Sequence, residues 1–200
     1  VQNIAMRNGF DNHESYERGG GGAIFVRGGQ LRIVNSRFVR NRCKTTGPDV
    51  GGAAVRALEQ WRDQPVYVVG SVFRGGRCSN GSGLSSIGVS WRVLNSVFRN
   101  NKAIGHGANP ADPGTPGGGS GGAIYLDGNR FTLELAGTTI QNNVANEGGG
   151  AVFFVSNDKT GTMTVRSSVL TDNPSHAFQN YPGIYFNSRG RPTFTDSVVR

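Results

Sequence analysis

The sequence predicts an all-β fold, a right-handed parallel β-helix of about six rungs with three short strands in each rung. Three observations carry this prediction: a phrase that recurs along the chain, apolar residues that alternate within it, and a glycine-led run that opens each copy. The two clearest copies are "GGAIFVRGGQLRIVNSRFVRN" at 21–41 and "SGGAIYLDGNRFTLELAGTTIQNN" at 120–143. Matching residues at matching positions indicate one unit stacked on itself, with neighbouring rungs about 4.8 Å apart.

The phrase is anchored on a short segment that recurs with variable spacing. The anchors are "NIA" at 3–5, "NSRF" at 35–38, "GSVF" at 70–73, "NSVF" at 95–98, "TTI" at 138–140, "SVL" at 168–170 and "SVV" at 197–199. A stacked unit tolerates insertions at its corners, so variable spacers between constant phrases are expected.

Two strands of each unit follow from local patterning. Before six of the anchors stand two apolar residues in alternation: Leu31 and Ile33, Val66 and Val68, Trp91 and Val93, Leu133 and Leu135, Met163 and Val165, Pro192 and Phe194. The glycine-led runs permit tight corners and continue into residues typical of strands. An antiparallel sandwich is the alternative, but it requires two-residue turns between strands and leaves the columns of like residues unexplained.

Asparagine recurs three positions after the anchor residue, at Asn8, Asn41, Asn101, Asn143 and Asn173, with Gly76 as the exception. Stacked side-chain amides at a buried turn explain such a column. Two positions later stand Phe10, Cys43, Cys78, Ala103, Ala145 and Ser175, which we expect to point inward.

Cys43 and Cys78 occupy this inward column in consecutive rungs, which places their Cα atoms about 5 Å apart, within the range of a disulfide. We expect a disulfide and therefore an oxidising compartment. Buried free thiols in a cytosolic protein are the alternative. Two cysteines without a spaced histidine do not supply the four ligands of a zinc site, so no metal or cofactor is expected.

The pairing of "GGAI" with "FxxN", at 21–24 with 38–41 and in related form at 121–124 with 140–143, resembles the rung motif of polymorphic outer-membrane proteins and pectate-lyase-like bacterial surface proteins. The resemblance covers nearly the whole chain. It implies a secreted or cell-surface bacterial protein with a structural or adhesive role. The motif itself is structural, so it implies no particular activity.

We expect residues 1–200 to form a single β-helix domain, a fragment of a longer chain, with 104–120 as a long Gly/Pro loop insertion. No apolar run approaches the roughly 18–20 residues of a membrane helix, so no membrane span is expected. Further rungs or a partner subunit are expected to cover the open ends of the coil, because an uncovered end exposes unpaired backbone groups.

The net charge of +8 lies in the first half, where residues 1–103 hold 15 Lys and Arg against 6 Asp and Glu. Basic side chains repeat in three outward columns: Arg32 with Arg92, Arg74 with Arg99, and Arg42 with Arg77 and Lys102. Guanidinium groups bind carboxylates and sulfates bidentately, so acidic polysaccharide or a cell-surface glycan is the predicted partner. The alternative is that these charges only deter edge-to-edge stacking. Nucleic acid is not favoured as a partner, because binding of single strands uses exposed aromatic side chains on which bases stack. Few such side chains are expected here, and Trp61 is the best candidate.

An enzyme acting on uronate-type polymers, either a polysaccharide lyase or a glycoside hydrolase, is the competing hypothesis. Its candidate acid and base residues lie in the long loops: His13, Glu14, Glu17, His106 and Asp112. "GHG" at 105–107 is similar to the histidine motif of polygalacturonases, but the companion Asn-Thr-Asp and Asp-Asp motifs that supply the carboxylates are absent. We found no complete catalytic constellation, and solvated polar loops are the ordinary explanation.

Overall fold

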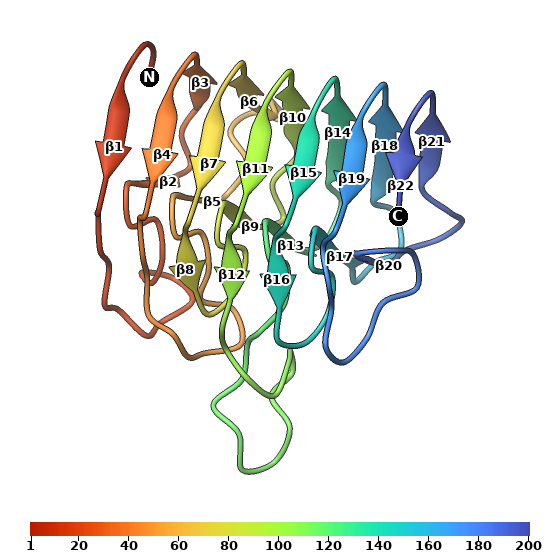
Figure 1. Cartoon of the computed structure of the whole chain (residues 1–200). Coiled ribbons are helices and arrows are strands. Elements are labelled where there is room, and N and C mark those ends of the chain that lie inside the picture. The colour runs from red at the N-terminus through yellow and green to blue at the C-terminus, as the bar shows by residue number, and fades with distance from the viewer.

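The computed structural model describes residues 1–200 as a parallel β-helix without any helical element. The chain winds in successive coils from one end to the other, and the first and last strands lie at opposite ends (Figure 1). Neighbouring strands within every sheet run parallel, for example β4 beside β7 and β10 beside β14. This arrangement confirms the predicted fold class and excludes the antiparallel sandwich.

The strands form three long sheets and one short sheet, which we number in the order in which a coil visits them. Sheet 1 contains β2 (Ile24–Arg27), β5 (Val55–Leu58), β9 (Leu84–Ile87), β13 (Ile124–Gly128), β17 (Val152–Ser156) and β20 (Ile184–Asn187). Sheet 2 contains β3 (Arg32–Val34), β6 (Val66–Val69), β10 (Trp91–Leu94), β14 (Thr132–Ala136), β18 (Thr162–Arg166) and β21 (Thr193–Thr195). Sheet 3 contains β1 (Ala5–Arg7), β4 (Arg37–Val39), β7 (Val72–Arg74), β11 (Val97–Arg99), β15 (Thr139–Gln141), β19 (Val169–Thr171) and β22 (Val198–Val199). Sheet 4 contains β8 (Arg77–Cys78), β12 (Lys102–Ala103) and β16 (Val144–Ala145).

The core is made of columns of like residues that point into the coil. Phe38, Phe73 and Phe98 are the central residues of three neighbouring strands in sheet 3. Their ring centroids lie 4.8 and 4.7 Å apart, and the rings are within 2° and 5° of parallel. Each ring therefore covers the face of the next at about the rung spacing, and all three are buried.

Side-chain amides form the predicted ladder at the turn after sheet 3. The Oδ1 atom of Asn143 accepts hydrogen bonds from the backbone N–H of Asn101, at 3.0 Å, and from its Nδ2, at 2.8 Å. Asn173 accepts from Asn143 in the same way, at 3.1 and 2.9 Å. The ladder supplies partners to backbone groups that the turn removes from the sheets, which satisfies the requirement for buried polar groups.

The register of the first copy differs from the prediction by one residue. Met6, not Ala5, lies opposite Phe38, so Gly9 occupies the ladder position that the sequence assigned to Asn8. The N–H of Gly9 donates to Asn41 Oδ1 at 2.9 Å. Phe10 is therefore not in the inward cysteine column, and it is 63% exposed. The copy "NIA" lacks the serine and phenylalanine that "NSRF", "GSVF" and "NSVF" share.

Gly76 interrupts the asparagine ladder for a steric reason. A Cβ atom at this position would lie 2.2 Å from the carbonyl oxygen of Ser82, far inside van der Waals contact. The N–H of Gly76 still donates to Asn101 Oδ1 at 2.9 Å, so the backbone of the ladder continues through the glycine.

A second ladder, of hydroxyl groups, lies before each strand of sheet 3. Ser71 Oγ accepts the N–H of Ser36 at 3.1 Å, and Ser96 Oγ accepts the N–H of Ser71 at 3.1 Å. Each hydroxyl also donates to a carbonyl two residues earlier, as Ser71 does to Val69 at 2.9 Å. The serine of "NSRF" and "NSVF" therefore has a structural role.

Cys43 and Cys78 form the expected disulfide, with Cα atoms 4.7 Å apart across 35 residues of sequence. Both cysteines are buried beside Val50 and Ala53, in a small apolar cluster separate from the main core. The covalent link joins two consecutive rungs at the level of sheet 4.

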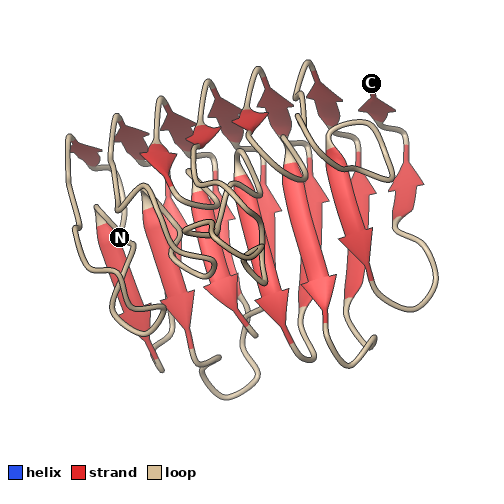
Figure 2. Cartoon of the chain, turned by 90° about the horizontal axis from the view of Figure 1, so that it is seen from below, coloured by secondary structure: helices blue, strands red, loops and turns tan.

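The 104–120 loop leaves the coil after β12 and returns before β13, and it hangs below the coil in Figure 1. The view from that side shows the parallel strands and the loops that cross in front of them (Figure 2). Asn109 of this loop bonds with Tyr125 and Asp127 of β13, so the loop packs against the outer face of sheet 1.

Candidate functional site

Exposed basic side chains cover the outer face of sheets 3 and 4 in the first rungs. In Figure 1 the short strands β8 and β12 continue below β7 and β11, so the two sheets present one continuous flank. We call this flank the basic surface and define it as Arg7, Arg37, Arg40, Arg42, Arg74, Arg77, Arg99 and Lys102. None of these eight side chains forms an ion pair, since every ion pair of the chain involves other residues.

Two of the predicted columns meet on the basic surface. Arg99 lies beside Arg74 in the register of β11 and β7. Arg77 of β8 lies between Arg42 and Lys102, because its backbone pairs with Arg42 on one side and with Lys102 of β12 on the other. Successive members are one rung apart, about 4.8 Å along the coil, so their like charges repel one another without a compensating acid. A polyanion lying along the flank would relieve that repulsion.

The third predicted column, Arg32 and Arg92, lies on sheet 2. It differs from the other two columns because its arginines contact an aromatic ring and an acidic side chain. Tyr67 stands between the two arginines, and their guanidinium carbons lie 5.6 and 5.9 Å from its ring centroid. Arg92 Nε is 3.2 Å from Glu134 Oε2, and Arg166 pairs with the same carboxylate. Within this column Arg92 therefore has an acidic partner, which it shares with Arg166, and Arg32 has only the ring of Tyr67.

The sequence prediction missed three arginines of the basic surface. Arg7, Arg37 and Arg40 join Arg74 around a groove of about 410 Å³. The register error in the first copy concealed Arg7. Arg37 has valine at the matching positions of the next strands, so no repeating column revealed it. Arg40 lies at a left-handed corner, with φ of 55°, where the other copies carry glycine, asparagine or aspartate.

The candidate acid and base residues fall into two separate groups. His13 Nδ1 lies 2.6 Å from Asp11 Oδ1, and Glu14 lies 2.6 Å from Lys44 Nζ. The Lys44 ammonium lowers the pKa of Glu14 by hydrogen bonding and by charge, which keeps this carboxylate ionised. Glu17 lies 3.9 Å from Arg27. These partners are local, and no hydrogen bond or ion pair joins this group to His106 or Asp112.

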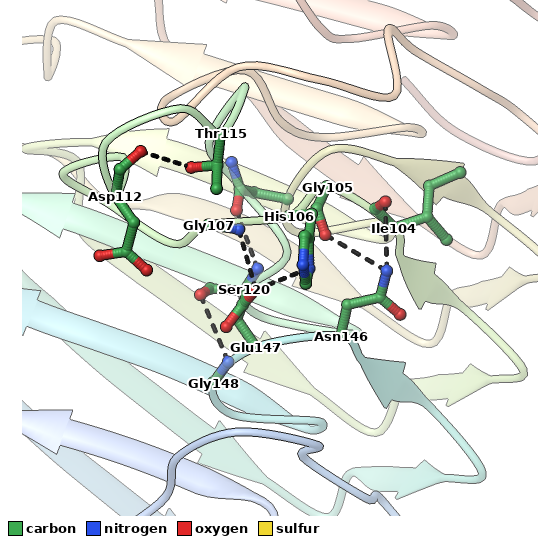
Figure 3. A network of polar contacts seen from close by, with 11 residues as sticks. Ile104, Gly105, His106, Gly107, Asp112, Thr115, Ser120, Asn146, Glu147 and Gly148 are labelled. Carbon is green, nitrogen blue, oxygen red and sulfur yellow. Dashed lines mark hydrogen bonds and ion pairs between the residues drawn. The ribbon is translucent and has the colours of Figure 1, made fainter.

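His106 takes part in a network that attaches the long loop to the coil (Figure 3). Glu147 Oε1 accepts the backbone N–H of Gly107 at 2.8 Å and lies 2.9 Å from His106 Nδ1. The Glu147 side chain is 11% exposed and that of His106 is 73% exposed. Asp112 engages Thr115 only through its backbone carbonyl. The buried carboxylate thus holds the base of the loop, and the imidazole covers it from the solvent side.

No group of three or more His, Cys, Asp and Glu side chains is arranged to hold a metal ion. The chain also contains no long apolar helix of the kind that crosses a membrane.

The chain was compared with known protein families. Residues 95–127 match the Chlamydia polymorphic membrane protein (Chlamydia_PMP) repeat. The matched segment runs from the anchor "NSVF", through the ladder residue Asn101, to the glycine-led strand β13. The chain is thus a β-helix repeat protein that resembles polymorphic membrane proteins, and the matched repeat indicates a bacterial surface or outer-membrane type of protein. No curated protein and no solved structure matches the chain.

Proposed function

We propose that this chain is part of a secreted or cell-surface bacterial protein with a structural or adhesive role, and that its basic surface binds acidic polysaccharide. One observation carries the proposal: eight exposed cationic side chains lie together on one flank and none has an acidic partner. Exposed charges of one sign raise the local concentration of a polyanion and its rate of association.

The shape of the flank supports a polymer as the ligand. The cations repeat along the coil axis at the rung spacing, from Arg7 at one end to Lys102 further along. Arginine predominates, and its planar fork matches carboxylate and sulfate groups better than a lysine ammonium does. The groove between Arg7, Arg37, Arg40 and Arg74 offers a recess where several guanidinium groups converge on one acidic substituent.

A glycan array that carries uronate polymers and sulfated polysaccharides tests the proposal. Arg74→Ala/Arg99→Ala is expected to weaken binding roughly 2- to 30-fold, because each exposed charge pair contributes about 0.2–1 kcal/mol. The matched control is Arg189→Ala/Arg191→Ala, which removes the same charge from exposed positions outside the basic surface. Added salt should weaken wild-type binding through screening.

Equal loss of binding in both double variants would indicate a nonspecific charge effect and would contradict the proposal. Release of unsaturated or reducing-end products from a uronate polymer would replace it with the competing hypothesis of a lyase or hydrolase.

A further inference from the structure

A groove of about 520 Å³ lies on the outer face of sheet 1, away from the basic surface. Alternation along the strands places Tyr125 and Asp127 of β13 on this outer face, beside Phe153 and Val155 of β17. Loops complete the groove: 44–50 contributes Asp49, 104–120 contributes Asn109, and two other loops contribute Tyr16 and Phe178. The volume lies within the range of roughly 300–1,000 Å³ found for small-molecule sites.

The polar end of the groove is short of hydrogen-bond donors. The Tyr125 hydroxyl lies 3.1 Å from Asp49 Oδ1 and 3.2 Å from Asp127 Oδ2. Asn109 Nδ2 lies 2.8 Å from Asp49 Oδ1, 2.8 Å from the Tyr125 hydroxyl and 2.9 Å from Asp127 Oδ2. A phenol carries one hydrogen and an amide nitrogen two, so these five contacts share three hydrogens. Asp127 Oδ1 is supplied separately, by the N–H of Gly128 at 2.6 Å and by Asn157 Nδ2 at 3.2 Å. The spare capacity to accept hydrogen bonds from a ligand therefore lies at Asp49 and at Asp127 Oδ2.

Behind this cluster the fully buried guanidinium of Arg56 donates to Ser85 Oγ at 2.6 Å and to the carbonyl of Tyr16 at 3.1 Å, and its Nε has no hydrogen-bond partner. Burial lowers the pKa of Arg56 to about 10, so it stays charged at neutral pH. Burial, with a smaller contribution from Asp49, raises the pKa of Asp127. One cation thus stands behind two carboxyl groups, and an acidic ligand at the groove would meet repulsion.

The remaining lining of the groove combines the amides of Asn157 and Asn187 with an apolar wall. Phe153 stacks on Tyr125, with centroids 4.8 Å apart, and on Tyr185, at 5.4 Å. Since the stacked faces are occupied within the column, ring edges and the side chains of Ile87 and Val155 are left to line the groove. Ring edges carry partial positive charge and therefore suit hydroxyl oxygens. The aliphatic side chains of Ile87 and Val155 offer van der Waals contact to C–H groups. They do not offer the free aromatic face that a cation requires.

We propose that this groove binds a neutral saccharide unit. Its hydroxyl groups donate to the carboxylates of Asp49 and Asp127, and its C–H groups pack on the apolar wall around Phe153. A sugar combines many hydroxyl donors with apolar ring patches and no charge, which matches the donor deficit, the wall and the two carboxylates together. This site is independent of the proposed acidic-polysaccharide function, because it lies on a different sheet and has the opposite charge.

Binding to an array of neutral glycans with terminal hexoses and N-acetylhexosamines, with hexosamine and uronate glycans alongside, tests the inference. Asp127→Asn removes the charge of one acceptor with little change of shape, and Val155→Phe fills the groove without touching the polar cluster. Asp127→Asn is expected to weaken neutral-glycan binding roughly tenfold or more, as for loss of a hydrogen bond to a charged group. Val155→Phe is expected to weaken it at least as much, because the larger side chain occupies the space of the ligand. Circular dichroism confirms that each variant retains the fold.

The two proposed sites are separable in the same experiment. Arg74→Ala/Arg99→Ala should leave neutral-glycan binding unchanged, and Asp127→Asn should leave acidic-polysaccharide binding unchanged. The inference is overturned if wild type binds no neutral glycan at millimolar concentration, if it binds only charged sugars, or if either groove variant binds as well as wild type.

Discussion

Replacing Asn143 with alanine is expected to destabilise the coil by about 3–5 kcal/mol. The side chain is fully buried, and its Oδ1 accepts both the backbone N–H and the Nδ2 of Asn101. Its own Nδ2 donates to the carbonyl of Phe98 at 3.1 Å. Alanine leaves the Asn101 N–H buried without an acceptor, at a cost of about 1–3 kcal/mol, and each further lost hydrogen bond adds about 1 kcal/mol.

Urea denaturation followed by circular dichroism measures the free energy of unfolding, and amide hydrogen exchange measures protection at Asn101. Asn129→Ala is the matched control, because Asn129 is exposed and its side chain makes no hydrogen bond within the chain. The control is expected to change stability by less than about 0.5 kcal/mol. If Asn143→Ala were no more destabilising than the control, or if exchange at Asn101 did not accelerate, the amide ladder would not be the source of stability inferred here.

Two other predictions concern covalent and electrostatic stabilisation. Cys43→Ala/Cys78→Ala should lower the free energy of unfolding by about 4 kcal/mol, because the disulfide restricts the chain entropy of the unfolded state over 35 residues. Urea denaturation of reduced wild-type protein should give the same free energy of unfolding as the double variant. Equal stability of the oxidised and reduced wild-type protein would contradict this prediction. Desolvation acts to raise the pKa of Asp158, but hydrogen bonds led by those from the N–H and hydroxyl of Thr160 outweigh it and lower the pKa to about 2. Because the folded-state pKa is lower than that of the unfolded chain, the stabilisation by Asp158 is present above about pH 4 and is lost as the pH falls toward about 2. The difference in Tm between wild type and Asp158→Asn should therefore vanish over that interval, and a difference that grows on acidification would refute the assignment.

The repeated pattern is sufficient to predict the coil and most of its interior. Parallel stacking places the same position of each copy directly above that of the previous copy. Residues that match in the aligned sequence are therefore in contact in the structure. Phe38 therefore lies against Phe73, and Cys43 lies within bonding distance of Cys78. The prediction of register was wrong only in the first copy, where "NIA" lacks the residues that define the alignment and the amide ladder runs through Gly9.

The surface grooves depend on the tertiary structure, because each includes residues that have no counterparts in the other copies. Arg37 and Arg40 have no counterparts in the other copies. No repeated column of residues therefore predicts the groove that they form with Arg74. Asp49 and Asn109 reach Tyr125 from two loops of different length and composition. The path of a loop depends on the side chains that it contacts in the folded coil. The base of the long loop, for example, is bound by the buried carboxylate of Glu147. The periodicity of the sequence carries no information about such contacts. The interior of this protein can therefore be predicted from its sequence, and its outer grooves cannot.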